Sequence, residues 1–194
     1  MSSTSFLTRD EIEGMGFRSV GRSVSVSRRA SFYGCGSMSI GNHSRIDDFT
    51  VLSCSGEGSI VIGDYVHIST HCLVIAPAIV RFEDFSGISS GCRIFAGSDD
   101  YGGDFLTNPC IPAKYRKHTA APVILGRHAV VGTGSTILYG VTLGECSAVG
   151  ALSLVLKDIP SGQIHAGVPA RYIRDRSLKL LEVERAFLEE EGGR

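Results

Sequence analysis

A repeat of six residues constrains the fold of this chain more than any other feature. Residues 125–160 divide into six consecutive hexads, LGRHAV, VGTGST, ILYGVT, LGECSA, VGALSL and VLKDIP. Each hexad opens with an aliphatic residue, four continue with glycine, and the fifth place is small or aliphatic throughout. A short fixed period of this kind is typical of a solenoid, and the hexapeptide period is that of a parallel β-helix.

In such a fold each hexad supplies one short strand and one corner, and three hexads complete a triangular coil. We expect the first and fifth places to point inward. Glycine after the aliphatic residue suits a corner that needs unusual backbone angles or the close approach of another segment. The same spacing continues upstream from Val20 to Ile94, which gives about six coils. The alternative is a run of ordinary buried strands with glycine turns, and the exact register of the hexads argues against it.

Segments without the repeat define the domain organisation. Residues 1–18 are predicted to contain a short leading helix, because Thr8 and Glu11 have the spacing of a capping box and Gly14 can end the helix. Residues 19–160 form the predicted β-helix domain. It is interrupted at 99–122 by a long loop of Gly, Pro, Asn and charged residues, which we expect to leave the coil and contact a neighbouring subunit.

The C-terminal segment, 161–194, is predicted to be a compact cap followed by an α-helix. A terminal element with polar outer residues would close the exposed end of the solenoid. The apolar positions of the predicted helix are Leu178, Leu181, Val183, Phe187 and Leu188.

Composition excludes several classes of protein. The 194 residues carry a net charge of −1, so there is no electrostatic case for binding nucleic acid or a membrane surface. No apolar run approaches the roughly 20 residues that span a bilayer, and the N-terminus has no signal-peptide core, so we expect no membrane insertion and a cytoplasmic location.

None of the six cysteines forms a C-x-x-C pair. Cys72 and Cys92 occupy the inward fifth place of their hexads and are expected to be reduced packing residues.

The repeat and its C-terminal flank carry a family resemblance. VVGTGSTILYGVTLGECSAVGALSLVLKDIPSGQIHAGVPARYIRDR closely resembles the C-terminal half of the hexapeptide-repeat acyltransferases, with the K-D-I-P and A-G-V-P-A-R segments after the last hexads. Upstream, ISIGNHSRIDDFTVLS, IGDYVHIS, EDFSGISS and SDDYGGDFLTNPCIP resemble a narrower group that acts on sugars in surface-polysaccharide and lipopolysaccharide pathways. That group includes nucleotide-linked 4-amino-sugar N-acetyltransferases and sugar O-acetyltransferases.

The resemblance implies a left-handed parallel β-helix that forms a homotrimer, with acetyl-CoA as acetyl donor bound between adjacent helices and no metal. By motif, Thr133 and Ala151 would meet the pantetheine arm of CoA. Lys157, Arg171 and Arg174 match positions near its nucleotide end, and cations suit the three phosphate groups of CoA. The alternative is that these cations are merely solvated.

Acyl transfer from a thioester needs a nucleophile, an acceptor for its proton and donors for the oxyanion. Sugar O-acetyltransferases of the family have a histidine where this chain has Asp99. A hydroxyl benefits from such a base, whereas a neutral amine is already nucleophilic, so the difference favours an amino-sugar acceptor. His118, in the loop, and His67, at a hexad corner, remain candidate bases. Asp99 itself is a third candidate catalytic residue. Asp47, Asp48, Asp99 and Asp100 are candidates for binding the hydroxyls or the ammonium group of the acceptor, with turn-forming carboxylates as the alternative.

We therefore predict acetyl transfer from acetyl-CoA to the amino group of a nucleotide-linked amino-deoxysugar, with O-acetylation of a sugar hydroxyl as the close alternative. Two rival classes stay open. One is a γ-carbonic-anhydrase-like zinc enzyme, for which His67 and His71 would supply two ligands. The other is a non-catalytic trimeric scaffold.

Overall fold

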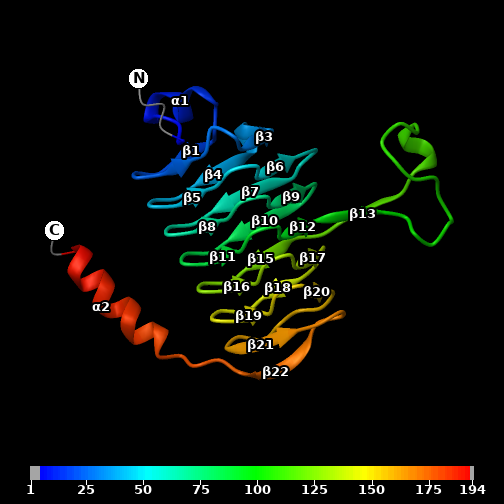
Figure 1. Ribbon diagram of the computed structural model, residues 1–194. Helices are drawn as coiled ribbons and strands as arrows, with labels where there is room; N and C mark the ends of the chain where they lie inside the picture. The colour runs from blue at the N-terminus through cyan, green and yellow to red at the C-terminus, as the bar shows by residue number, and fades with distance from the viewer. Residues whose placement is uncertain (1–4, 193–194) are drawn as a thin grey trace.

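The computed structural model describes residues 5–192 and contains three parallel sheets wound into a left-handed β-helix (Figure 1). Residues 1–4 and 193–194, which belong to the predicted terminal segments, lie outside the described residues. Successive strands pass from sheet 1 to sheet 2 to sheet 3 and then start the next coil. The result is six complete coils and one further strand of a seventh, which confirms the predicted fold class.

Sheet 1 consists, in spatial order, of β1 (Ser19–Val20), β4 (Met38–Ile40), β7 (Ser59–Ile62), β10 (Ile79–Phe82), β15 (Val123–Leu125) and β18 (Thr142–Leu143). Sheet 2 consists of β2 (Ser25–Val26), β5 (Arg45–Ile46), β8 (His67–Ile68), β11 (Gly87–Ile88), β16 (Val130–Val131), β19 (Ala148–Val149), β21 (Gln163–Ala166) and β22 (Arg171–Asp175). Sheet 3 consists of β3 (Ser31–Tyr33), β6 (Val51–Cys54), β9 (Leu73–Ala76), β12 (Arg93–Phe95), β17 (Thr136–Leu138) and β20 (Leu154–Val155). A short 3-10 helix, η1 (Cys35–Ser37), precedes β4.

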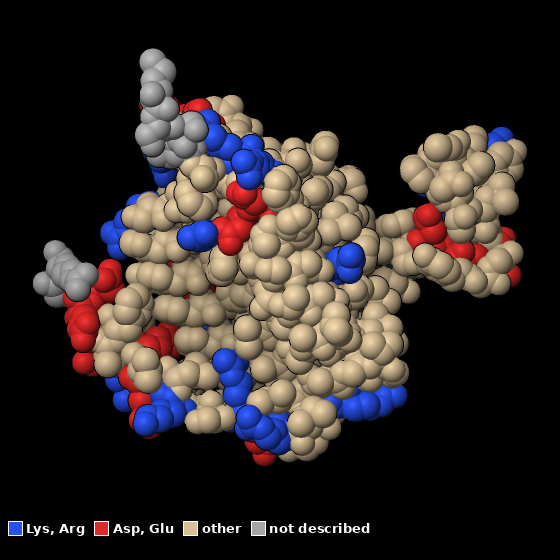
Figure 2. All heavy atoms as spheres, in the orientation of Figure 1, with Lys and Arg blue, Asp and Glu red and all other residues tan. Residues whose placement is uncertain are grey.

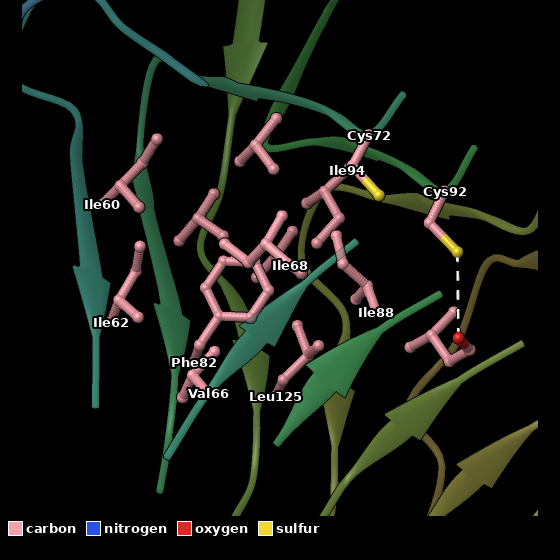
Figure 3. Packing of buried hydrophobic residues seen from close by; sticks show 14 of the residues in the cluster. Ile60, Ile62, Val66, Ile68, Cys72, Phe82, Ile88, Cys92, Ile94 and Leu125 are labelled. Atoms are coloured by element: carbon pink, nitrogen blue, oxygen red, sulfur yellow. Dashed lines mark hydrogen bonds between the residues drawn. The ribbon is translucent and has the colours of Figure 1, made fainter. Parts of the chain in front are cut away.

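The aliphatic first place of the hexad builds the core. Ile68, Ile88 and Val131 follow one another in β8, β11 and β16 in parallel register, and each is at most 2% exposed. Figure 3 shows side chains of neighbouring coils filling the interior, with Phe82 among the isoleucines. Cys72 is a buried free thiol of the fifth place, and burial raises its pKa to about 12. An interior of this kind is stabilised by roughly 25 cal/mol for each Å² of apolar surface removed from water.

The glycine in the second hexad place is explained by close approach. A Cβ on Gly132 would lie 2.5 Å from the backbone nitrogen of Ala151 in the next coil, and one on Gly63 would lie 2.5 Å from Oδ1 of Asp84. The left-handed backbone conformation falls two residues later, in the fourth hexad place. Tyr65 and His128, for example, have φ values of 56° and 59°. Each corner is therefore formed by two places with separate requirements.

The predicted long loop is a projecting hairpin between coils 4 and 5 (Figure 1). Its two legs, β13 (Gly97–Asp99) and β14 (His118–Ala120), are antiparallel and pair Asp99 with His118. Residues 101–110 at its outer end are exposed, and a 3-10 turn, η2 (Ala113–Tyr115), lies on the returning branch. The excursion begins two residues earlier than the predicted start at Asp99.

The two ends of the solenoid are covered differently. Helix α1 (Arg9–Gly14) has the predicted capping box, and the carboxylate of Glu11, which also binds Arg28, has its pKa lowered to about 2. Hydrogen bonds from Arg28 are the main cause of that shift. At the other end the chain turns back as β21 and β22, an antiparallel pair that extends sheet 2.

The end of the solenoid is covered by the β21–β22 pair and not by the C-terminal helix. Helix α2 (Leu180–Gly192) instead runs along the side of coils 3 to 5 (Figure 1). Of the predicted apolar face, Val183 is 61% and Leu188 41% exposed, and Leu178 precedes the helix. Phe187 and the polar Glu184 contact the solenoid, and Leu181 lines a hollow with Cys146 and Gly162. Neither helix within residues 5–192 is long and apolar enough to cross a bilayer.

Candidate active site

A cleft of about 570 Å³ lies on the outer face of sheet 2 and contains two of the predicted site residues, His67 and Thr133. Its floor is formed by outward residues of β8, β11 and β16, among them Gly87 and Val130. Hydroxyl groups of Ser89 and Ser90 line the side that leads to the corner between sheets 2 and 3. The cleft thus offers a hydroxyl-rich surface beside the predicted path of the pantetheine arm.

His67 is oriented by a carboxylate. Its Nε2 lies 2.7 Å from Oδ2 of Asp47, and Arg45 donates to the other oxygen of the same carboxylate at 2.6 Å. Burial alone would raise the pKa of Asp47, but the hydrogen bonds from His67 and Arg45 outweigh it and lower that pKa. An ionised carboxylate that fixes an imidazole leaves Nδ1 as the ring nitrogen for exchanging a proton with a ligand.

Asp99 and His118 are brought together at the base of the hairpin, where they pair across β13 and β14. Oδ2 of Asp99 accepts a hydrogen bond from the backbone of Asn108 at 3.0 Å. The His118 ring lies over Gly97, since a Cβ there would approach its Cε1 to 2.5 Å. Both residues line a broad hollow with Pro77 at the corner between sheets 3 and 1. This hollow and the cleft on sheet 2 lie at different corners of the same chain.

The other two predicted acceptor-binding residues already have protein partners. Asp100 accepts hydrogen bonds from the backbone amides of Gly102, Asp104 and Phe105, each at 2.9 Å. The bonds from Gly102 and Phe105 are the main causes that lower its pKa. These contacts give Asp100 the turn-forming role that was its alternative.

Asp48 lies in coil 2, away from the hairpin. It accepts from the Ser27 hydroxyl and pairs with Arg29 at 3.2 Å. Asp48 therefore stands apart from both Asp99 and the cleft on sheet 2.

Two of the predicted cofactor residues lie at the corner between sheets 2 and 3. Thr133 and Ala151 are exposed on successive coils, and the backbone of Leu152 donates to the Thr133 carbonyl at 2.8 Å. Lys157 follows β20 at the corner between sheets 3 and 1, whereas Arg171 lies in β22, and both line a hollow of about 250 Å³ at the C-terminal end. Figure 2 shows basic side chains gathered at that end of the molecule. Arg174 is exposed in β22 but does not line this hollow.

A stack of rings at the corner between sheets 1 and 2, which we call the corner stack, was missed from the sequence. It consists of His43, Tyr65, Phe85 and His128 in coils 2 to 5, with neighbouring ring centroids 4.8–5.1 Å apart. All four occupy the fourth hexad place and have a positive φ. Tyr65, Phe85 and His128 also line the cleft. Aromatic residues recurring at the fourth place were the signal that could have revealed it.

The corner stack ends at a buried ionic group. Nε2 of His128 lies 2.8 Å from Oε2 of Glu184 on α2, and Arg127 pairs with the other oxygen of that carboxylate. Burial, followed by the charges of Arg127 and Arg176, lowers the pKa of His128. Within residues 5–192, no group of three or more His, Cys, Asp or Glu side chains is arranged to hold a metal ion.

A left-handed β-helix with a hydroxyl-lined cleft and a hollow that contains two cations fits the class of hexapeptide-repeat acyltransferases. Comparison with known proteins narrows the assignment, although no protein-family model matches the sequence. The chain is 42% identical over 182 residues, 94% of each protein, to the dTDP-4-amino-4,6-dideoxy-D-glucose acyltransferase of Escherichia coli. It belongs to the nucleotide-amino-sugar acyltransferases of this class.

Solved structures agree with this assignment. AntD, an N-acyltransferase from Bacillus cereus in complex with dTDP and 3-hydroxybutyryl-CoA, superposes with a TM-score of 0.93 at 38% identity and covers 97% of this chain and 99% of its own. A variant of AntD in complex with dTDP-4-amino-4,6-dideoxyglucose and Coenzyme A gives a TM-score of 0.92 at 38% identity over the same share of each chain.

Proposed function

We propose that this acyltransferase moves an acetyl group from acetyl-CoA to the amino group of a nucleotide-linked amino-deoxysugar for surface-polysaccharide synthesis. The E. coli relative named for a dTDP-4-amino sugar supports the acceptor, and the AntD complexes support a CoA thioester as donor. A cytoplasmic location is part of the proposal, because acyl-CoA and nucleotide-linked sugars are cytoplasmic metabolites.

The observation that carries the proposal is the cleft on sheet 2. Its lining offers Ser69, Ser89, Ser90 and Thr133 as hydroxyl partners, contains Arg176, and includes no Asp or Glu. Such a lining suits a ligand that combines sugar hydroxyls with a negatively charged diphosphate. The cleft also adjoins the edge that carries Thr133 and Ala151, so a ligand there would lie next to the thioester.

A homotrimer would bring Asp99 and His118, the remaining candidate catalytic residues, close to the cleft on sheet 2. Several outward residues of sheet 3 are apolar and partly exposed, namely Leu73, Ile75, Phe95 and Leu138. An apolar outer face of this kind favours burial against other copies. If three chains turn sheet 3 toward a common axis, the corner between sheets 2 and 3 of one subunit meets the corner between sheets 3 and 1 of the next. Asp99 and His118 of one subunit would then face Thr133 of its neighbour.

Acyl transfer needs few protein groups once the amine of the acceptor sugar is neutral. The amine lone pair attacks the thioester carbonyl, a new C–N bond forms, the C–S bond breaks, and CoA leaves as the thiol with the proton that the nitrogen loses. We assign Asp99 the role of binding the ammonium form and orienting the amine. His118 and His67 remain the candidate acceptors of the proton, and a base near neutral pH suits that task. Lys157 and Arg171 would bind phosphate groups of CoA.

The test is CoA thiol release with a panel of acceptors and donors. dTDP-linked 4-amino sugars, the matching 4-hydroxy sugars and free sugars should be compared, each with acetyl-CoA, butyryl-CoA and 3-hydroxybutyryl-CoA. Turnover restricted to amino acceptors with acetyl-CoA preferred is the expected result. Turnover with hydroxyl acceptors only would establish O-acetylation instead. Stoichiometric zinc without CoA binding would replace the proposal with a hydratase, and the absence of any thermal shift with acetyl-CoA would favour a scaffold.

A further inference from the structure

The outer wall of the cleft does not come from the β-helix. Leu180, in the first turn of α2, and Arg176, in the segment before it, line the cleft opposite the outward face of sheet 2. Nη1 of Arg176 donates to the carbonyls of His128 and Ser147 at 2.8 and 3.0 Å, which fixes a positive charge there. A ligand bound in the cleft would therefore touch the helix segment as well as the solenoid.

Phe187 attaches the middle of α2 to the solenoid. Its ring stands edge-on to Tyr65, at 5.3 Å and 83°, and to Phe85, at 6.2 Å and 87°. Edge-to-face contacts of this kind are favourable because the ring edge is positive and the ring face negative. Since Tyr65 and Phe85 also line the cleft, the same rings receive the helix and face the ligand.

Glu184, one turn before Phe187, makes the second attachment. Its side chain is 11% exposed and binds both Arg127 and His128. Arg127 in turn lies 4.8 Å from the centre of the Phe85 ring. The carboxylate and the ring of α2 thus hold the helix at one site, the corner stack, while Leu180 and Arg176 extend from that site over the cleft.

We propose that Phe187 and Glu184 are positioning residues for the acceptor: they hold α2 against the corner stack so that Leu180, beside the separately anchored Arg176, completes the binding site for the nucleotide-linked sugar. This inference rests on the proposed function and adds to it that acceptor affinity, unlike donor affinity, depends on a helix outside the β-helix. Loss of either contact would weaken acceptor binding, because α2 would no longer hold Leu180 over the cleft. Donor binding would not change, because Thr133, Lys157 and Arg171 would keep their positions.

The kinetic test compares Phe187→Ala with Leu188→Ala, its exposed neighbour on the same helix. We expect Phe187→Ala to raise the KM for the nucleotide-linked amino sugar about tenfold and to leave the KM for acetyl-CoA within about twofold. Phe187→Tyr, which keeps the ring edge, should restore the acceptor KM, and Glu184→Gln should raise it as well. An unchanged acceptor KM in Phe187→Ala, or an equal rise in both KM values, would overturn the inference.

A second test uses the absence of tryptophan from the sequence. Phe187→Trp introduces a single tryptophan, whose emission can be excited separately from that of the tyrosines, at the contact between α2 and the corner stack. We expect its emission to shift when dTDP is added and to stay constant when CoA is added. No shift with dTDP, in a variant that retains turnover, would refute the role of α2. Failure of the wild-type enzyme to acylate any nucleotide-linked amino sugar would refute the proposed function itself, which is a separate outcome.

Discussion

The hollow that contains Lys157 and Arg171 makes the sharpest prediction about the donor. Both side chains are exposed at the C-terminal end, so each would bind a phosphate in a solvated setting. A charge-assisted hydrogen bond contributes about 1.5–3 kcal/mol, and exposed ion pairs contribute less, so we take roughly 1–1.5 kcal/mol for each cation. Lys157→Ala should then raise the KM for acetyl-CoA about five- to twelvefold, because 1.4 kcal/mol corresponds to a factor of ten.

Steady-state kinetics at two ionic strengths would measure this effect. The Debye length falls from about 10 Å at 0.1 M salt to about 3 Å at 1 M, so the difference between wild type and Lys157→Ala should shrink as salt is added. Acetyl-CoA that lacks the 3′-phosphate would show whether that phosphate is the partner of Lys157. If it is, wild type and Lys157→Ala should have the same KM for this donor. Arg22→Ala, which removes an exposed cation from coil 1, is the matched control. A KM within twofold of the wild type for both Lys157→Ala and Arg171→Ala would refute the assignment of the CoA nucleotide end.

Other substitutions and reagents test the remaining features. Asp99→Asn and His118→Ala should lower kcat by different factors. If neither substitution lowers kcat about tenfold, which corresponds to 1.4 kcal/mol, another group takes the proton of the acceptor amine. Phe82→Ala should lower the free energy of unfolding by about 3–5 kcal/mol in denaturant titrations, because the ring is 0% exposed, and a loss under 1 kcal/mol would contradict the packing. In native protein at pH 8 the exposed Cys110 should react with a thiol reagent within minutes. Cys72 should not react, since its raised pKa leaves it protonated until the pH approaches about 12, and rapid labelling of Cys72 would show that the coils open.

The coil architecture could be predicted from the sequence because the repeat is local and regular. Inward positions such as Ile68 and Val131 recur with the period of the hexad, and one register determines every coil. The function of glycine was only half predicted, because close approach at Gly132 and the left-handed conformation at His128 belong to different places of the hexad. Periodicity alone does not separate these two requirements.

The docking of the C-terminal helix and the position of the cleft could not be predicted in the same way. The spacing of apolar residues in α2 indicated an inward Val183 and Leu188, but docking depends on the shape and charge of the corner stack, which is assembled from separate coils. His67 and Thr133 were chosen from different motifs, and only the parallel winding brings them into one cleft. Asp99 and His118 lie at another corner, and the sequence alone does not show how the two places would be brought together.

The paired base of the hairpin has a consequence for exchanging the loop that it closes. Because Gly97 and Ala120 are already bonded side by side, the segment between them is closed at its root whatever its length. Each doubling of such a segment adds only about 0.6 kcal/mol of closure entropy, and the coils above and below contact each other independently of it. Replacement of residues 100–117 by a segment of another length should therefore leave the winding of the coils, and the pairing of Asp99 with His118, intact.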